Sequence, residues 1–162
     1  MFSTNGTLGG MSQQEPDRVS PGGALSRKMS TLARRDTAPE LALRRALHAR
    51  GLRYRVQMKV PGNRRRSIDV ALTRVRLAVY VDGCFWHGCP EHGSTPRANS
   101  DWWRWKIERN RARDADTTAS LEAAGWTVLR FWEHEDPSLA AVIVEAERRR
   151  LLEALTRPHG RG

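Results

Sequence analysis

The sequence predicts an α/β fold in which a mixed β-sheet is flanked by helices. The hydrophobic patterns follow the order helix, three strands, helix, strand, helix. The first three strands are joined by short turns, which is typical of a hairpin-type portion. A long helix separates them from the last strand and predicts a crossover connection. The 162 residues are enough for one domain with a hydrophobic core once the two ends are discounted.

The ends of the chain differ in composition from its middle. Residues 1–25 are rich in Ser, Gly, Gln and Pro and lack hydrophobic periodicity, so we expect them to be disordered. Residues 26–35 form a basic segment that precedes the first regular element. A single domain is therefore predicted over residues 26–156, followed by a flexible tail at residues 157–162.

The first helix has boundary signals at both ends. Thr37 and Glu40 have the spacing of a capping box, and Pro39 is tolerated in a first turn. Gly51 is placed to end the helix.

Three strands are predicted next, at residues 54–58, 67–72 and 75–81, with a dense positive patch at residues 64–66. Asp69 lies inside the second of these runs, among apolar residues. Such a strand is usually buried on both faces, so a carboxylate within it indicates a function. The alternative is a strand-end residue that caps a turn.

A long helix is predicted from residue 99 or 100 to about residue 123. Its first turns carry Trp102, Trp103 and Trp105, which no single helical face can hold. We therefore expect at least one exposed indole, as part of a partner surface. A fourth strand at residues 126–132 and a last helix opened by Asp136-Pro137 complete the pattern.

The chain is strongly basic, with 28 Lys and Arg against 18 Asp and Glu and a net charge of +10. Clustered cations of this kind are typical of nucleic-acid binders, because they neutralise phosphates. An arginine-rich genome is the alternative explanation. The basic segment is then either an arm that embraces DNA, with Arg27, Lys28 and an apolar tip at Met29, or a solvated linker. Because the chain lacks a long apolar run and a secretory core, we expect a cytoplasmic, nucleoid-associated protein.

The most informative stretch, residues 79–92, contains both cysteines. In a reducing compartment two cysteines are thiols or metal ligands rather than a disulfide. Cys84, Cys89 and His92 can wrap one tetrahedral ion, and His134 is the best-placed remaining histidine to complete it. Four N/S ligands predict a structural zinc. The alternative is two buried free thiols and a surface histidine.

Catalytic chemistry is indicated by carboxylates on neighbouring strands. Asp69 and Asp82 can lie close together, as expected of a Mg²⁺ site for phosphodiester cleavage. His87 is a candidate general acid or base, and Asp114 in the long helix can orient it by accepting from its ring N–H. The alternative for Asp114 is a solvated helix-surface residue.

Several strings of the sequence are distinctive in combination. They are Asp36-Thr37-Ala38-Pro39-Glu40, Asp69, Asp82-Gly83-Cys84-Phe85-Trp86-His87-Gly88-Cys89, Trp103 with Lys106-Ile107 and Asn110, Asp114, and Gly125-Trp126 with Trp132-Glu133. Together they resemble the very short patch repair (Vsr) endonucleases, over about residues 26–134. The resemblance implies a restriction-endonuclease-like core of the PD-(D/E)xK type with a structural zinc site. It also implies an enzyme that nicks the T-bearing strand of a T·G mismatch left by deamination of 5-methylcytosine.

The resemblance further implies roles for individual residues. Asp69 and the main-chain carbonyl of Val81 would hold a catalytic Mg²⁺, His87 would be the catalytic histidine and Asp114 its paired carboxylate. Glu40 occupies the family's N-terminal acidic position. The zinc ligands would be Cys84, Cys89, His92 and His134, and the aromatic wedge at the mismatch Phe85, Trp86 and Trp103, with Met29 inserted from the other groove. The implied partners are mismatched duplex DNA, mismatch-repair proteins and a cognate cytosine-5 methyltransferase, with the enzyme as a monomer.

The sequence departs from the family at Val81-Asp82, where a Thr-His pair is expected. An Asp binds metal but is a poor general acid near pH 7 unless its pKa is raised, which favours a two-carboxylate Mg²⁺ site. Three alternatives stay open. They are a nuclease for other mismatches, modified bases or unmodified sites, a zinc-stabilised DNA-binding module without catalysis, and an RNA-binding domain.

Overall fold

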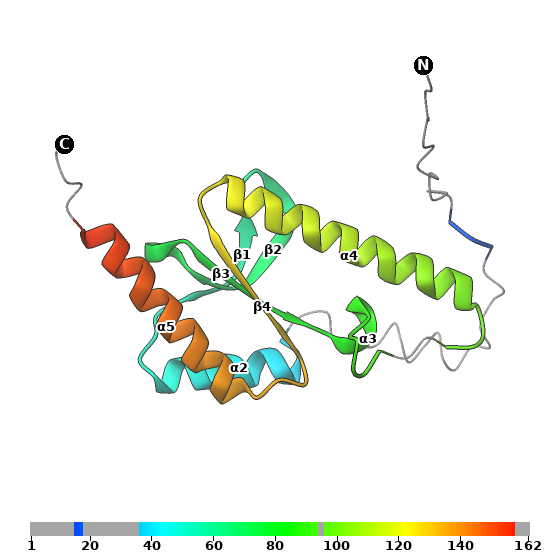
Figure 1. Cartoon of the computed structure of the whole chain (residues 1–162), viewed down its shortest axis with the longest axis horizontal. Helices are drawn as coiled ribbons and strands as arrows, with labels where there is room; N and C mark the ends of the chain where they lie inside the picture. Colours follow the sequence, from blue (N-terminus) through cyan, green and yellow to red (C-terminus); the bar gives the residue numbers. More distant parts are fainter. Residues whose placement is uncertain (1–14, 18–35, 94–95, 158–162) are drawn as a thin grey trace, which may run out of the picture.

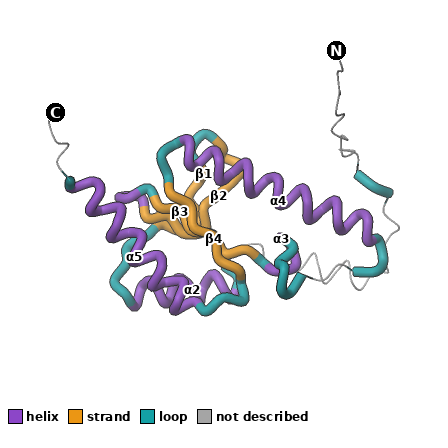
Figure 2. Tube along the Cα trace, in the orientation of Figure 1, coloured by secondary structure: helices purple, strands orange, loops and turns teal. Residues whose placement is uncertain are grey.

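The computed structural model describes residues 15–17, 36–93 and 96–157. Within these residues one mixed sheet is flanked by helices (Figure 1 and Figure 2), which confirms the predicted α/β architecture. The basic segment with Arg27, Lys28 and Met29 lies outside the described residues, as do most of residues 1–25 and the last five residues.

The sheet has the strand order β1-β2-β3-β4, with β1 and β2 antiparallel, β2 and β3 antiparallel, and β3 and β4 parallel. The predicted hairpin-type portion and the crossover are therefore both present. The strands are β1 (Arg55–Val60), β2 (Asn63–Leu72), β3 (Leu77–Asp82) and β4 (Thr127–Trp132). Because β3 and β4 are parallel, their carboxyl ends meet at the same edge of the sheet.

Helices cover both faces of the sheet (Figure 1). The helical elements are α2 (Ala38–Ala49), η1 (Thr73–Val75, a 3₁₀ turn), α3 (Cys84–His87), α4 (Ser100–Ala123) and α5 (Pro137–Thr156). Helices α2 and α5 share a core with one face of the sheet, and Leu121 of α4 belongs to a second core on the other face. Among the described residues no helix is both long and apolar enough to cross a membrane.

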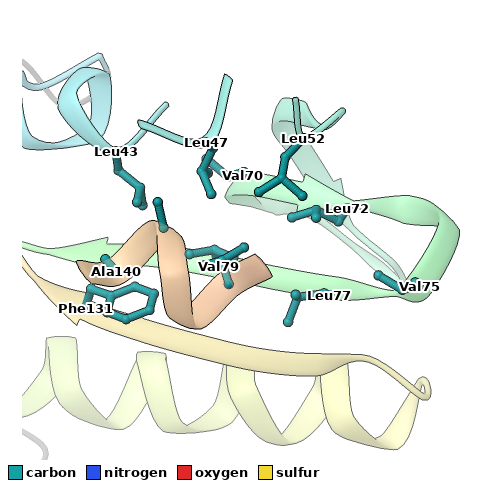
Figure 3. Packing of buried hydrophobic residues seen from close by; sticks show 12 residues of the cluster. Leu43, Leu47, Leu52, Val70, Leu72, Val75, Leu77, Val79, Phe131 and Ala140 are labelled. Carbon is teal, nitrogen blue, oxygen red and sulfur yellow. The ribbon is translucent and has the colours of Figure 1, made fainter. Parts of the chain in front are cut away.

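The larger core lies between the sheet and the pair α2 and α5 (Figure 3). Leu43 and Leu47 of α2 meet Val79 of β3 and Phe131 of β4 there, all of them buried. The two leucines are four residues apart and so lie on one face of α2, and alternate side chains of a strand point to the same face of the sheet. These side chains therefore meet between the helix and the sheet. This core packs β3 and β4 against α2 and α5, and the ends of the two strands carry the candidate site.

The structure differs from the sequence-based expectations in three places. Strand β2 begins at Asn63 rather than residue 67, so the arginines at 64–66 lie within the hairpin. Residues 84–87 form one turn of helix instead of a loop. The expectation of an exposed indole is wrong: Trp102 and Trp103 are buried and Trp105 is half-buried. Trp102 donates to Glu15, which is distant along the chain, and the Arg109 guanidinium covers the ring of Trp105.

Candidate nuclease centre and metal site

A cluster of sulfur and nitrogen atoms lies beyond the ends of β3 and β4. The Nδ1 atom of His134 is 3.1 Å from Cys84 Sγ and 3.7 Å from Cys89 Sγ. Cys89 Sγ is also 4.0 Å from His92 Nδ1, and one ligand atom from each of the four residues lies within 4.8 Å of the others. The predicted four residues are thus brought together from two strand ends and one short loop.

The donor set of this cluster fits zinc. Two thiols and two imidazoles match the soft and borderline ligands of tetrahedral zinc sites, in which bonds of about 2.0–2.3 Å separate the ligand atoms by nearly 4 Å. Burial, followed by the neighbouring Cys89, raises the pKa of the Cys84 thiol to about 11. Without a cation this thiol therefore keeps its proton, and binding of zinc would release it.

Helix α3 is held at both ends by side chains from other elements. Glu133, directly after β4, accepts a hydrogen bond of 2.7 Å from the Cys84 N–H at the start of α3. At the other end, the Asn110 side chain donates to Trp86 O at 2.9 Å, and Arg111 donates to the carbonyls of His87 and Gly88. A one-turn helix has no internal partners for these groups, so Glu133 supplies one for the N–H group and α4 supplies those for the carbonyls.

The aromatic residues of α3 and α4 form one cluster. The ring centroid of Phe85 is 5.1 Å from that of Trp86 and 5.1 Å from that of Trp103, both in edge-to-face arrangements. Trp102 packs edge-on against Trp103 with centroids 4.8 Å apart. Helix α3 lies beside the N-terminal half of α4 (Figure 1), so these rings stabilise the contact between the two helices.

The histidine and carboxylates predicted to act together do meet. His87 Nδ1 is 2.5 Å from Asp114 Oδ2 and 3.9 Å from Asp82 Oδ1. Burial raises the pKa of Asp114, but the hydrogen bond and charge of His87, with Arg130 and Arg113, bring the net pKa below its ordinary value. A carboxylate bonded to Nδ1 places the ring proton there, so Nε2 is the nitrogen left for a reaction.

A cleft of about 320 Å³ opens beside this group. It is lined by Asp82, His87, Gly88, Pro90, Arg111, Asp114, Arg130, Phe131 and Trp132. His87 therefore combines an Nδ1 held by Asp114 with access to a cavity that carries two guanidinium groups and two carboxylates. The guanidinium of Arg111 is not paired with either carboxylate and is suited to an anionic substrate.

Asp69 lies on β2, outside the lining of that cleft. Its Oδ2 accepts a hydrogen bond of 3.1 Å from the Val81 N–H on β3. Burial raises the pKa of Asp69 to about 6, against the lowering effect of the Val81 N–H, and the charges of Glu40 and Asp82 raise it further. Carboxylates gathered in this way form a site whose repulsion a divalent cation would relieve.

Glu40 is buried in the first turn of α2, where Thr37 is the N-cap. Its carboxylate accepts from the Asp36 N–H, from the Thr37 hydroxyl at 3.2 Å and from Arg44 at 3.2 Å. The Thr37 hydroxyl in turn accepts from the Glu40 N–H at 3.5 Å, so the predicted pairing of Thr37 with Glu40 is present, although the Glu40 carboxylate bonds the Asp36 N–H. The same carboxylate contributes charge at Asp69.

Asp82 has a partner that the sequence-based prediction missed. Both of its carboxylate oxygens accept from Arg130 on β4, at 2.8 and 2.7 Å. Arg130 is also 3.5 Å from Asp114, and its guanidinium stacks over the ring of Tyr80 at 4.7 Å. The rule that singled out Asp69, a charged residue inside an apolar strand, would have found Arg130 if applied to residues 127–132.

Known proteins related to this chain act on DNA. A family model described as DNA mismatch endonuclease Vsr matches residues 23–91. The type II nicking enzyme V.NaeI of Lentzea aerocolonigenes is 43% identical over 122 residues, covering 73% of this chain and 74% of that enzyme. The type II nicking enzyme V.XorIIP of Xanthomonas oryzae pv. oryzae is 40% identical over 128 residues, covering 77% and 89%. The DNA mismatch endonuclease Vsr of Escherichia coli is 34% identical over 113 residues, covering 67% and 68%. The chain therefore belongs to the Vsr family of DNA mismatch endonucleases.

Proposed function

We propose that this endonuclease nicks double-stranded DNA at T·G mismatches that arise from deamination of 5-methylcytosine, and so starts very short patch repair. The observation that carries the proposal is the His87–Asp114 pair, which lines a cleft that also holds Arg111 and Arg130. His87 belongs to the same helix, α3, as Phe85 and Trp86 of the aromatic cluster. One relative is named a DNA mismatch endonuclease and others are named nicking enzymes.

Asp69 is the proposed side-chain ligand of a catalytic Mg²⁺, with the main-chain carbonyl of Val81 beside it. The Val81 N–H already binds Asp69, so the two groups are neighbours on adjacent strands. When bound, Mg²⁺ would polarise the phosphodiester and lower the pKa of a water molecule. Glu40 and Asp82 add negative charge around Asp69 that favours a cation.

His87 is the proposed proton-transferring residue. Asp114 holds the ring through Nδ1, and the peptide carbonyl of His87 is held in turn by Arg111. The remaining ring nitrogen can exchange a proton with the attacking water or with the leaving oxygen. Arg111 on the cleft wall supplies positive charge for the phosphate.

The aromatic cluster is the proposed wedge at the mismatch, through Phe85, Trp86 and Trp103. Opening a base step takes a few kcal/mol, less at a mismatch, and stacked rings recover part of it. We propose that zinc held by Cys84, Cys89, His92 and His134 fixes the base of this wedge. The zinc would take no part in catalysis, because protein side chains fill all four of its coordination positions. The arm with Arg27, Lys28 and Met29 is proposed to hold the duplex from the opposite groove.

Nicking of a labelled duplex tests the proposal. Purified protein with Mg²⁺ should nick the T strand of a T·G duplex, and Asp69→Ala should abolish nicking without loss of zinc. Undiminished cleavage by Asp69→Ala would contradict the active-site assignment. Absence of nicking on every duplex would leave a zinc-stabilised DNA-binding module, and a preference for single-stranded RNA would favour an RNA-binding domain.

A second candidate is a nicking enzyme for other mismatches, modified bases or unmodified sites. The relatives named type II nicking enzymes favour it, as does Asp82 in place of the family histidine. Nicking rates on duplexes of equal length that carry each mismatch, 5-methylcytosine or no modification separate the two candidates.

Repair proteins and a cognate cytosine-5 methyltransferase are proposed as partners of a monomeric enzyme.

A further inference from the structure

Arg130 of β4 lies between the carboxylates of the candidate nuclease centre. It pairs in register with Tyr80 of β3, two residue pairs before Asp82 and Trp132. Its guanidinium stacks on the Tyr80 ring, gives two hydrogen bonds to Asp82 and approaches Asp114 to 3.5 Å. The side chain is only 25% exposed, so these contacts are screened little by solvent.

The two carboxylates near His87 make a cation necessary. Asp114 and Asp82 both face His87 Nδ1, at 2.5 and 3.9 Å. Two such charges in a partly buried place repel each other, and one imidazole cannot neutralise both. Arg130 is the cation that does so, since it contacts both carboxylates.

The geometry also distinguishes the roles of the two carboxylates. Both oxygens of Asp82 are bonded to Arg130, and therefore Asp114 is the close acceptor for His87 Nδ1. A single acceptor fixes both the tautomer and the orientation of a histidine ring. Nε2 is then the ring nitrogen left for a reaction in the cleft that His87 lines.

Asp82, His87 and Asp114 have ligand atoms close enough for a metal ion. However, the guanidinium of Arg130 already neutralises the carboxylates of this trio. A metal ion bound by Asp82 would have to displace two charge-assisted hydrogen bonds.

On the basis of the function proposed above, we infer that Arg130 is a positioning residue. Its bidentate pairing with Asp82 keeps Asp82 away from His87 and Mg²⁺, and leaves Asp114 alone to orient the His87 ring for nicking.

The test compares Arg130→Met, Asp82→Asn and the double variant in single-turnover nicking, with DNA affinity measured separately. Arg130→Met leaves Asp82 free to compete for His87, and Asp82→Asn leaves Arg130 free to attract Asp114. Each single variant should therefore nick about 10–100-fold more slowly, with nearly unchanged DNA affinity. The double variant restores the lone His87–Asp114 pair and should nick about tenfold faster than Arg130→Met.

Three controls keep the test specific. Arg130→Lys retains the charge but loses the bidentate fork, so its rate should lie between wild type and Arg130→Met. Arg150→Met removes an exposed ion pair with Glu147 on α5 and should nick at the wild-type rate. The Mg²⁺ concentration that gives half the maximal rate should be the same for Asp82→Asn and wild type.

Several results would overturn the inference. A double variant as slow as Arg130→Met would show that the two residues do not act as a pair. An effect of Arg130→Met on DNA affinity alone would make Arg130 a DNA contact. A raised Mg²⁺ requirement in Asp82→Asn would make Asp82 a metal ligand.

A spectroscopic measurement separates this inference from the proposed function. Long-range ¹H–¹⁵N correlation spectra, assigned with His87→Gln, report which ring nitrogen of His87 carries the proton. Wild type should show protonated Nδ1 as the single neutral form, and Arg130→Met should show a mixture. An unchanged His87 signal in Arg130→Met would overturn the inference even if the wild-type protein nicked no DNA. A wild-type protein that nicked nothing but showed the expected spectra would count against the proposed function alone.

Discussion

Replacing Asp69 by asparagine should make the metal-free protein more stable while abolishing nicking. Asn has nearly the same shape as Asp and can still accept the hydrogen bond from the Val81 N–H. Asn has no charge, so it avoids the free-energy cost of burying a charged group and the repulsion from Glu40 and Asp82. These two effects raise the pKa of Asp69.

The size of the effect follows from the pKa. Moving it from 3.8 to about 6 corresponds to about 3 kcal/mol against the ionised form in the folded protein. Because the folded-state pKa is raised, the stability tied to protonated Asp69 is fully present below pH 3.8 and is lost as the pH rises through about 6. At pH 8 Asp69→Asn should therefore be more stable than wild type by up to about 3 kcal/mol, and at pH 4 the two should be nearly equal.

Urea unfolding at pH 4 and pH 8, with and without Mg²⁺, measures this difference. At a concentration near 100 times its dissociation constant, Mg²⁺ should stabilise the wild-type protein by about 2.7 kcal/mol and Asp69→Asn hardly at all. Asp101→Asn is the matched control, since the Asp101 side chain is 77% exposed and its loss should change neither quantity. The reasoning would be refuted if Asp69→Asn were less stable than wild type at pH 8, or if Mg²⁺ stabilised both proteins equally.

Further outcomes follow from the same geometry. Nicking at limiting Mg²⁺ should fall about tenfold per pH unit below pH 6, because protons compete with the metal for Asp69, and a flat profile would exclude this residue as the ligand. Asp114→Asn should slow single-turnover nicking about 10–100-fold, since the bond to His87 is charge-assisted; a wild-type rate would contradict the pairing. Cys84→Ala should lower the zinc content from about one per chain, measured by mass spectrometry, together with the unfolding temperature, and unchanged content would exclude the site. Trp86→Ala should weaken binding to a mismatched duplex about tenfold, measured by fluorescence anisotropy, and less so to a matched one, whereas equal losses would exclude a wedge.

Much of the fold and of the candidate site was predictable from local patterns. The capping box at Thr37, the alternation along the strands and the apolar spacing of the helices specify their elements through nearest-neighbour physics. Asp69 was recognisable because a charge inside an apolar strand requires a physical reason. The cysteines and histidines of residues 84–92 were recognisable because they lie close together along the chain.

The tertiary structure alone decided which charges compensate one another. Asp82 and Arg130 are far apart in sequence, and only the parallel pairing of β3 with β4 places them side by side. The burial of Trp102 depended in the same way on a contact from Glu15, which no helical periodicity encodes. A sequence records which residues carry charge, hydrogen-bond donors or aromatic rings. The free energy of a partly buried charge depends on its neighbours in space, so the roles of Asp82 and Arg130 could be assigned only after the sheet had brought them together.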